Sequence, residues 1–106
     1  MIDASSVAEI VAQYQKHGWT LRRALLSPEG TIAFGALLGN IEQLESDFDA
    51  LWFSRFSQPE LESWELRRLT ALPFALLTAA SDDAPVEERE AALSEIEEEM
   101  RERTFA

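Results

Sequence analysis

The sequence predicts an α+β fold in a single small domain that spans residues 1–106. Apolar residues recur at helical spacing near both ends of the chain, whereas large aromatic residues crowd into short runs in its middle. We therefore expect an antiparallel sheet of three or four strands. An N-terminal helix, a middle helix and an acidic C-terminal helix should pack mainly on one face of that sheet. An all-α bundle is the alternative architecture.

Two central runs, 50–56 and 63–69, organise this prediction because they hold two of the three tryptophans. The segment Trp64-Glu-Leu-Arg-Arg68 also resembles the earlier segment Trp19-Thr-Leu-Arg-Arg23. Side chains alternate between the two faces of an extended chain, so each segment would place its tryptophan, its leucine and one arginine on a common face. Two similar strands of one sheet explain this likeness more simply than an internal repeat.

The N-terminal helix is indicated by a capping box from Ser6 to Glu9, in which each side chain satisfies a free backbone amide. Gly18 suits the left-handed residue that ends many helices. The apolar positions of this helix form one stripe: Val7, Ile10, Val11 and Tyr14. The only histidine, His17, falls in the last turn, where a capping or surface role is expected.

A first strand is expected over 19–26, followed by a second helix. Ser27 is a typical N-cap and Pro28 a typical first helical residue. That helix should run to about Leu38, because Gly39 and the asparagine after it form a strong turn signal.

Residues 41–72 allow two interpretations. Five apolar residues here recur at helical spacing, which keeps the all-α bundle open: Ile41, Leu44, Phe48, Leu51 and Trp52. However, three aromatic residues within 52–56 would crowd a helix face and suit a pleated strand better. We favour strands over roughly 49–56 and 63–70.

The last third should contain a short edge strand and a long helix. Pro73 interrupts what precedes it, and a short strand is expected over 74–77. Residues 79–84 are expected to form a loop, and Pro85 to open the terminal helix. The apolar stripe of that helix is narrow: Val86, Leu93, Ile96 and Met100.

Charge and composition exclude several classes of function. The net charge is −11, and residues 71–106 alone carry ten acidic and three basic residues. Such an acidic chain is repelled by nucleic acid and by anionic membranes. No apolar run approaches the ~20 residues that cross a bilayer, so we expect a soluble, cytoplasmic protein. The chain has no cysteine and one histidine, which rules out thiolate metal sites and most nucleophilic triads.

Five residues form the candidate binding site: Trp52, Arg55, Trp64, Arg67 and Arg68. Guanidinium groups bind carboxylates and phosphates, so arginines that converge in a hollow would make an anion site. The simpler interpretation is that they pair with the many neighbouring carboxylates and lie along aromatic rings. The carboxylates at 82–83 and 97–99 lack the pattern of a calcium loop, so neither a metal nor a cofactor is expected.

The function that we expect is that of a small acidic, non-catalytic interaction module, such as an adaptor, an inhibitor or a regulatory subunit. It would bind a protein partner, favouring a basic one, through the aromatic and arginine-rich sheet face or through the acidic C-terminal helix. A homodimer is expected, because helices on one face would leave aromatic residues of the other face exposed. The alternative is a small-molecule or anion-binding domain, with or without enzymatic activity, that has a pocket near Arg55, Arg67 and Arg68.

Overall fold

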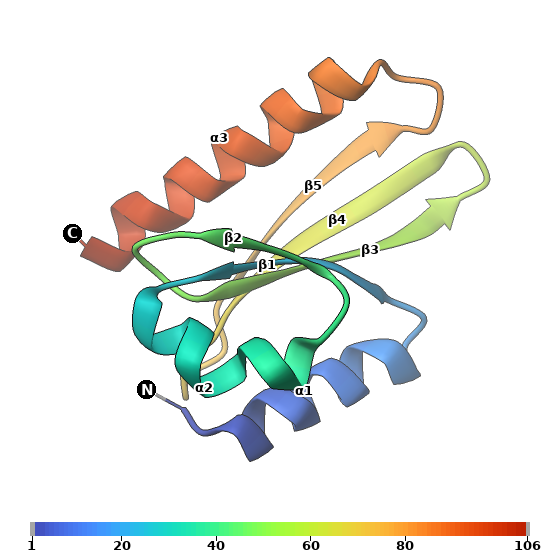
Figure 1. Ribbon diagram of the computed structural model, residues 1–106. Coiled ribbons are helices and arrows are strands. Elements are labelled where there is room, and N and C mark those ends of the chain that lie inside the picture. The colour runs from blue at the N-terminus through green and yellow to red at the C-terminus, as the bar shows by residue number, and fades with distance from the viewer. Residues whose placement is uncertain (1, 106) are drawn as a thin grey trace.

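The computed structural model describes residues 2–105 and contains three helices and five strands (Figure 1). In chain order these elements are α1 (Ala4–Lys16), β1 (Thr20–Leu26), α2 (Pro28–Leu38), β2 (Glu42–Glu45), β3 (Ala50–Gln58), β4 (Leu61–Arg68), β5 (Ala75–Ser81) and α3 (Val86–Phe105). The strands form one sheet in the order β2-β1-β3-β4-β5. The α+β class is thus confirmed, and the all-α alternative is wrong.

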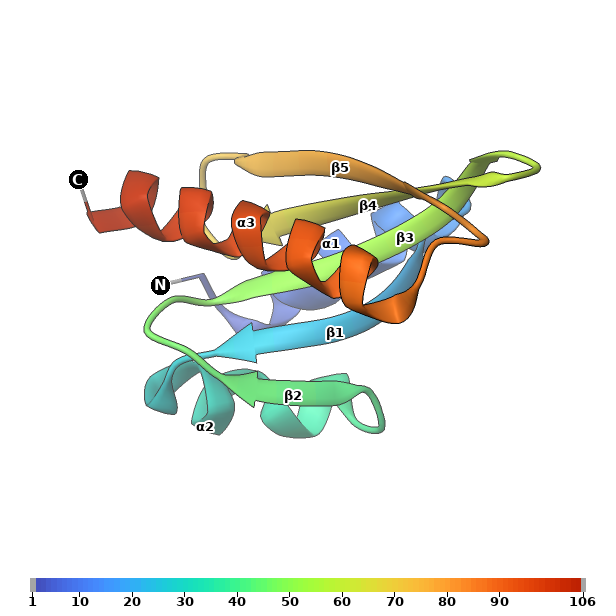
Figure 2. The same ribbon diagram turned by 90° about the horizontal axis from the view of Figure 1, so that it is seen from above.

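The sheet separates two helical layers. Helices α1 and α2 lie below it and α3 lies above it in Figure 1. Seen from above in Figure 2, α3 crosses the sheet diagonally, and β2 and β5 form its two edges. The expectation that the helices pack mainly on one face is therefore wrong. The strand count also needs correction, because the sheet has five strands and β1 and β2 run parallel.

Strand β2 was missing from the sequence prediction for a physical reason. It has only four residues, Glu42-Gln-Leu-Glu45, and three of them are polar. What makes it a strand is its place in the chain: α2 returns the backbone beside β1, and Leu44 pairs with Leu25 in parallel register. The two paired residues are far apart in the sequence, so the pattern within residues 42–45 does not predict a strand.

The helix starts follow local capping chemistry. In α2, Ser27 is the N-cap as predicted, and its Oγ accepts a hydrogen bond from the Gly30 amide at 3.1 Å. Helix α1 begins earlier than expected, at Ala4, with Asp3 as its N-cap instead of Ser6. The Ser6 amide donates to the Asp3 carboxylate at 2.8 Å, and this hydrogen bond lowers the pKa of Asp3. Gly18 follows α1 with φ +87°, as its position after the helix predicts.

Each face of the sheet buries its own apolar core. The core below the sheet joins Val7 of α1 and Phe34 of α2 to Phe53 of β3. The predicted stripe of α1 points into it, and Tyr14 stacks on Phe53 with ring centroids 4.0 Å apart. The core above the sheet is assembled from β1, β3, β4, α3 and the loop before β3: Leu25, Phe48, Ala50, Trp52, Trp64, Leu66, Leu93 and Met100.

The C-terminal part differs from the prediction in two places. Strand β5 continues to Ser81, so residues 79–81 belong to the sheet and not to a loop. Leu93 and Met100 of α3 are buried as the stripe predicted, but Val86 is 59% exposed. Among residues 2–105, no helix is both long and apolar enough to cross a membrane.

Candidate interaction site

The two tryptophans of the predicted site belong to the upper core. Trp52 is 0% exposed and Trp64 is 1% exposed, and their rings meet edge to face at 6.1 Å beneath α3. The indole N–H of Trp52 donates to Glu97 of α3 at 2.8 Å, which satisfies its polar end. Neither ring is accessible to a partner in the monomer, because α3 covers the face that was expected to stay open.

Arg55 lies apart from the other arginines of the predicted site. Its guanidinium carbon is 4.6 Å from the centre of the Trp19 ring, and its Nη1 donates to the His17 carbonyl at 2.9 Å. This arrangement ties the end of α1 to β3. Arg55 pairs with Ser63 across the sheet, which is four positions along β4 from Arg67, so the three arginines do not converge.

Arg67 is a buried cation. The residue is 9% exposed, and its guanidinium Nη1 donates to the carbonyl of Arg68. Among residues 2–105 it forms no ion pair. It lines a cleft of about 460 Å³ between α1 and the β4–β5 connection. Most of its N–H donors have no hydrogen-bond partner among residues 2–105.

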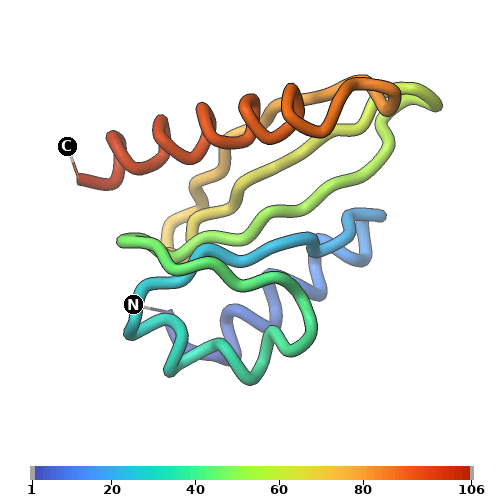
Figure 3. Tube along the Cα trace, turned by 45° about the horizontal axis from the view of Figure 1, so that its top comes forward, coloured from blue at the N-terminus to red at the C-terminus, as the bar shows by residue number. Residues whose placement is uncertain are grey.

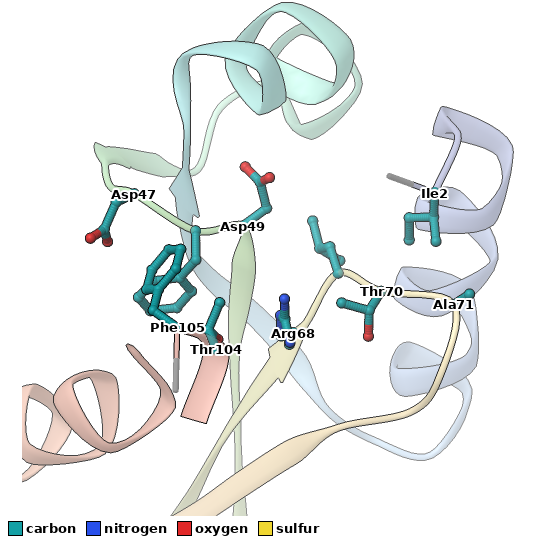
Figure 4. Close-up of a pocket in the computed structure, with 10 residues that line it drawn as sticks. Ile2, Asp47, Asp49, Arg68, Thr70, Ala71, Thr104 and Phe105 are labelled. Carbon is teal, nitrogen blue, oxygen red and sulfur yellow. The ribbon is translucent and has the colours of Figure 1, made fainter. Parts of the chain in front are cut away.

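Arg68 points to the opposite face, as the alternation of side chains along β4 requires. It lines a second cleft, of about 340 Å³, which is bounded by the end of α3 and by the β4–β5 connection. In Figure 4 the Asp49 carboxylate points toward α2 and the Asp47 carboxylate points away from Arg68. The two carboxylates have other partners, since Asp49 accepts from Ser27 at 2.8 Å and Asp47 pairs with Arg101 at 3.4 Å.

The edge of β5 is a further feature: the sequence predicted a short edge strand over 74–77, and β5 does lie at the edge of the sheet, but the prediction did not include it in the binding site. The Arg68 amide donates to the Phe74 carbonyl at 2.9 Å, and the Asp82 amide donates to the Glu60 carbonyl at 3.0 Å. In an antiparallel ladder, hydrogen-bonded pairs recur at every second residue. The even-numbered residues of β5 therefore direct their backbone groups to β4. The odd-numbered residues Ala75, Leu77, Ala79 and Ser81 direct theirs outward, where the sheet ends.

The same odd-numbered residues expose their side chains. They project from the lower face and are exposed, whereas the even-numbered residues of β5 are half-buried. Helices α1 and α2 lie on the side of the sheet away from α3 (Figure 3), and α1 reaches β3 and β4, where Tyr14 contacts Phe53 and Glu65. Strand β5 lies beyond these contacts, because its odd-numbered side chains are exposed. Leu77 is the large apolar residue of this open strip and is 63% exposed. The signal in the sequence was a seven-residue run without charge or proline, Ala75–Ser81.

The acidic side chains of residues 2–105 do not form a metal-binding cluster in the structure. Within residues 2–105, no group of three or more histidine, aspartate or glutamate side chains is arranged to hold a metal ion. Carboxylates of α3 contact arginines, as in the pair between Arg103 and Glu99 at 3.4 Å, and Glu97 accepts the hydrogen bond from Trp52.

Comparison of the chain with protein-family models, with curated proteins and with solved structures finds no match. The function therefore has to be inferred from the geometry of the molecule.

Proposed function

We propose that this protein is a small acidic, non-catalytic interaction module that works as a homodimer joined through β5. The observation that carries this proposal is the open edge of β5, where an uncharged strand of seven residues ends the sheet beside the exposed side chain of Leu77. An unprotected edge of this kind is a template for pairing with another strand. A second copy of the same strand is the simplest occupant, because antiparallel pairing across a two-fold axis is self-complementary.

The register follows from which backbone groups point outward. With Leu77 on the two-fold axis, Ala75 of one copy lies opposite Ala79 of the other. Ala75, Leu77 and Ala79 then form three hydrogen-bonded pairs, or about six hydrogen bonds between the copies. Each Leu77 side chain meets its symmetry mate on the open lower face, so the dimer buries the apolar residue that the monomer leaves in water.

Charge at the two ends of β5 favours the same arrangement. Arg68 lies beside the start of β5, because it pairs with Phe74. Asp82 and Asp83 are exposed and follow its end. Antiparallel pairing brings the arginine end of one copy toward the acidic end of the other. Strand β5 itself carries no charge, so the net charge of −11 does not repel along the shared edge.

The acidic surface then determines the kind of protein that the dimer would attract. A basic partner gains from long-range attraction to a chain of charge −11, whereas acidic proteins are repelled. The roles of adaptor, inhibitor and regulatory subunit all remain open to such a module.

Sedimentation equilibrium tests the proposal with Leu77→Glu and a matched control, Ile32→Glu. Both changes place one carboxylate at an exposed apolar residue, because Ile32 of α2 is 88% exposed. In the dimer, the carboxylate introduced by Leu77→Glu would face its own symmetry mate, a like charge, directly across the two-fold axis. We expect the wild type and Ile32→Glu to dimerise, and Leu77→Glu to dissociate about 100-fold more readily.

Circular dichroism should show the same helix and strand content for all three proteins, because neither substitution reaches a core. A wild type that remains monomeric at high concentration contradicts the proposal. So does a Leu77→Glu protein that dimerises as tightly as Ile32→Glu.

A further inference from the structure

The unused hydrogen-bond donors of Arg67 point to a ligand. Glu65 lies on the same face of β4, two residues earlier, but its carboxylate accepts a hydrogen bond from the Tyr14 hydroxyl. Arg67 is therefore left with the Arg68 carbonyl as its hydrogen-bond partner within residues 2–105. A guanidinium offers five N–H donors, so most of its donor capacity remains available. An anion that enters the cleft would accept several of these charge-assisted hydrogen bonds at once.

The walls of this cleft limit the ligand further. Ser6, Glu9 and Gln13 of α1 line it, and their spacing places them on one side of that helix. Ile2 and Ile10 supply apolar surface beside these polar groups. The volume of about 460 Å³ falls in the range of small-molecule sites, which combine apolar walls with a few fixed polar groups.

Glu9 decides which kind of anion fits. Glu9 lines the same cleft as Arg67, and its carboxylate forms no ion pair within the part of the chain that the structure describes. A phosphate carries close to two negative charges and would be repelled by this second carboxylate. A ligand with one carboxylate and one ammonium group satisfies both residues.

We propose that the cleft between α1 and the β4–β5 connection binds a free amino acid. The ligand carboxylate would accept hydrogen bonds from the Arg67 guanidinium, and its ammonium group would lie toward Glu9. The apolar walls formed by Ile2 and Ile10 would contact its side chain, so an aliphatic amino acid is the best fit. This site is separate from the edge of β5 and does not depend on the homodimer.

Saturation-transfer NMR with the standard amino acids as probes tests the proposal, followed by isothermal calorimetry on those that bind. Acetate, inorganic phosphate and methylamine serve as fragments that carry only part of the required chemistry. We expect an aliphatic amino acid to bind at least tenfold more tightly than any of the three fragments. Arg67→Gln should weaken this binding at least tenfold. Arg55→Gln, which removes an arginine outside the cleft, should leave it unchanged.

Glu9→Gln supplies a second variant that does not disturb the core, because Glu9 is exposed. It should weaken amino-acid binding severalfold and strengthen phosphate binding, a reversal that loss of stability alone does not produce. The proposal is overturned if no amino acid binds at millimolar concentration, or if phosphate binds best to the wild type. It is equally overturned if Glu9→Gln leaves the preference unchanged.

Discussion

The two edges of the sheet differ in every property that controls strand pairing. Strand β2 has four residues, begins and ends with glutamate, and pairs with its neighbour in parallel. Strand β5 has seven residues, carries no charge, and pairs antiparallel. Short, charged edges resist the addition of a further strand, whereas long uncharged edges invite it. The comparison teaches that this acidic protein keeps charge away from one edge only, and that edge is where we expect contact.

Neighbouring elements also hold β2 in place. Its Gln43 Nε2 donates to the Gly35 carbonyl of α2 at 2.9 Å, and its Glu42 pairs with Arg23 of β1 at 2.9 Å. Strand β5 has no comparable partner on its outer side within residues 2–105. The β2 edge is thus closed by the protein's own side chains, whereas the β5 edge stays open.

After Leu77→Glu, the largest effect on dimerisation is expected from Ala79→Pro. The Ala79 amide points outward, so proline leaves the β4–β5 hydrogen bonds intact and removes a donor from the dimer. Two bonds are lost across the two-fold axis, at about 1 kcal/mol each, which weakens dimerisation about 30-fold. Sedimentation equilibrium measures the change. An unaltered dissociation constant would mean that β5 does not pair at this residue.

Gly30→Ala should disrupt the contacts at the start of α2, on the β2 side of the sheet, without affecting β5. A Cβ at Gly30 would lie 2.0 Å from Asp49 Oδ1, so Asp49 must swing away from Ser27. The bond from the Ser27 amide to Asp49, at 2.8 Å, and support of the α2 cap are then lost. We expect a destabilisation of about 1–2 kcal/mol, although alanine is the better helix former.

Urea unfolding measures this loss best in a Leu77→Glu background, because dimerisation then does not contribute to the apparent stability. In the wild-type background, the dimer dissociation constant should stay the same. A Gly30→Ala protein as stable as its parent would show that Asp49 moves without cost.

Tyr14 permits a pH test of the contact between α1 and β4. Burial, together with the hydrogen bond to Glu65, raises the pKa of Tyr14 above its usual value of 10.0. The folded state therefore favours the neutral phenol. Its contribution to stability is complete below pH 10 and is lost as the pH rises from there toward the folded pKa.

Tyr14 is the only tyrosine, so ultraviolet absorbance reports its ionisation alone. In the native protein the midpoint should lie well above that measured in denaturant. Tyr14→Phe should abolish the signal and destabilise the protein by about 1 kcal/mol. A native midpoint near 10 would contradict the buried contact with Glu65.

The smallest effect on stability is expected from Gly35→Ala, in the same helix as Gly30. Its Cβ would lie 3.4 Å from Gln43 Oε1, a distance that the side chain accommodates with little movement. Alanine should then stabilise the protein by up to about 1 kcal/mol through helix propensity. Thermal unfolding should therefore show opposite shifts for the two glycine substitutions, and a loss of stability at both would refute the difference in packing.

Much of the fold followed from local patterns in the sequence. Interactions between residues close in the sequence determine three predicted features: the stripe of α1, the Ser27-Pro28 start of α2 and the aromatic strands around Trp52 and Trp64. The missed features depend on tertiary pairing. Strand β2 exists because α2 returns the chain beside β1, and α3 covers the upper face because Leu93 and Met100 fill the space above the tryptophans.

The candidate site was less predictable than the fold. The sequence grouped Arg55, Arg67 and Arg68 by composition, but their separation depends on register and on the alternation of side chains along β4. The open edge of β5 depends on strand order, which no pattern within Ala75–Ser81 reveals. An edge strand over 74–77 was nevertheless predicted from Pro73, and the uncharged character of the segment would have justified attention to it as a pairing surface.

The most direct test of the proposed edge is oxidation of Leu77→Cys. The chain has no cysteine of its own, so any disulfide must join two copies at this residue. Directly opposite residues of a hydrogen-bonded antiparallel pair lie about 5.5 Å apart at Cα, within the range found in disulfides, and a local twist of the exposed edge brings their Cβ atoms to bonding distance. Ile32→Cys is the control, and it is the more exposed site, at 88% against 63%. We predict rapid and nearly complete cross-linking at Leu77→Cys and slow cross-linking at Ile32→Cys, and equal rates at the two sites would contradict a dimer joined through β5.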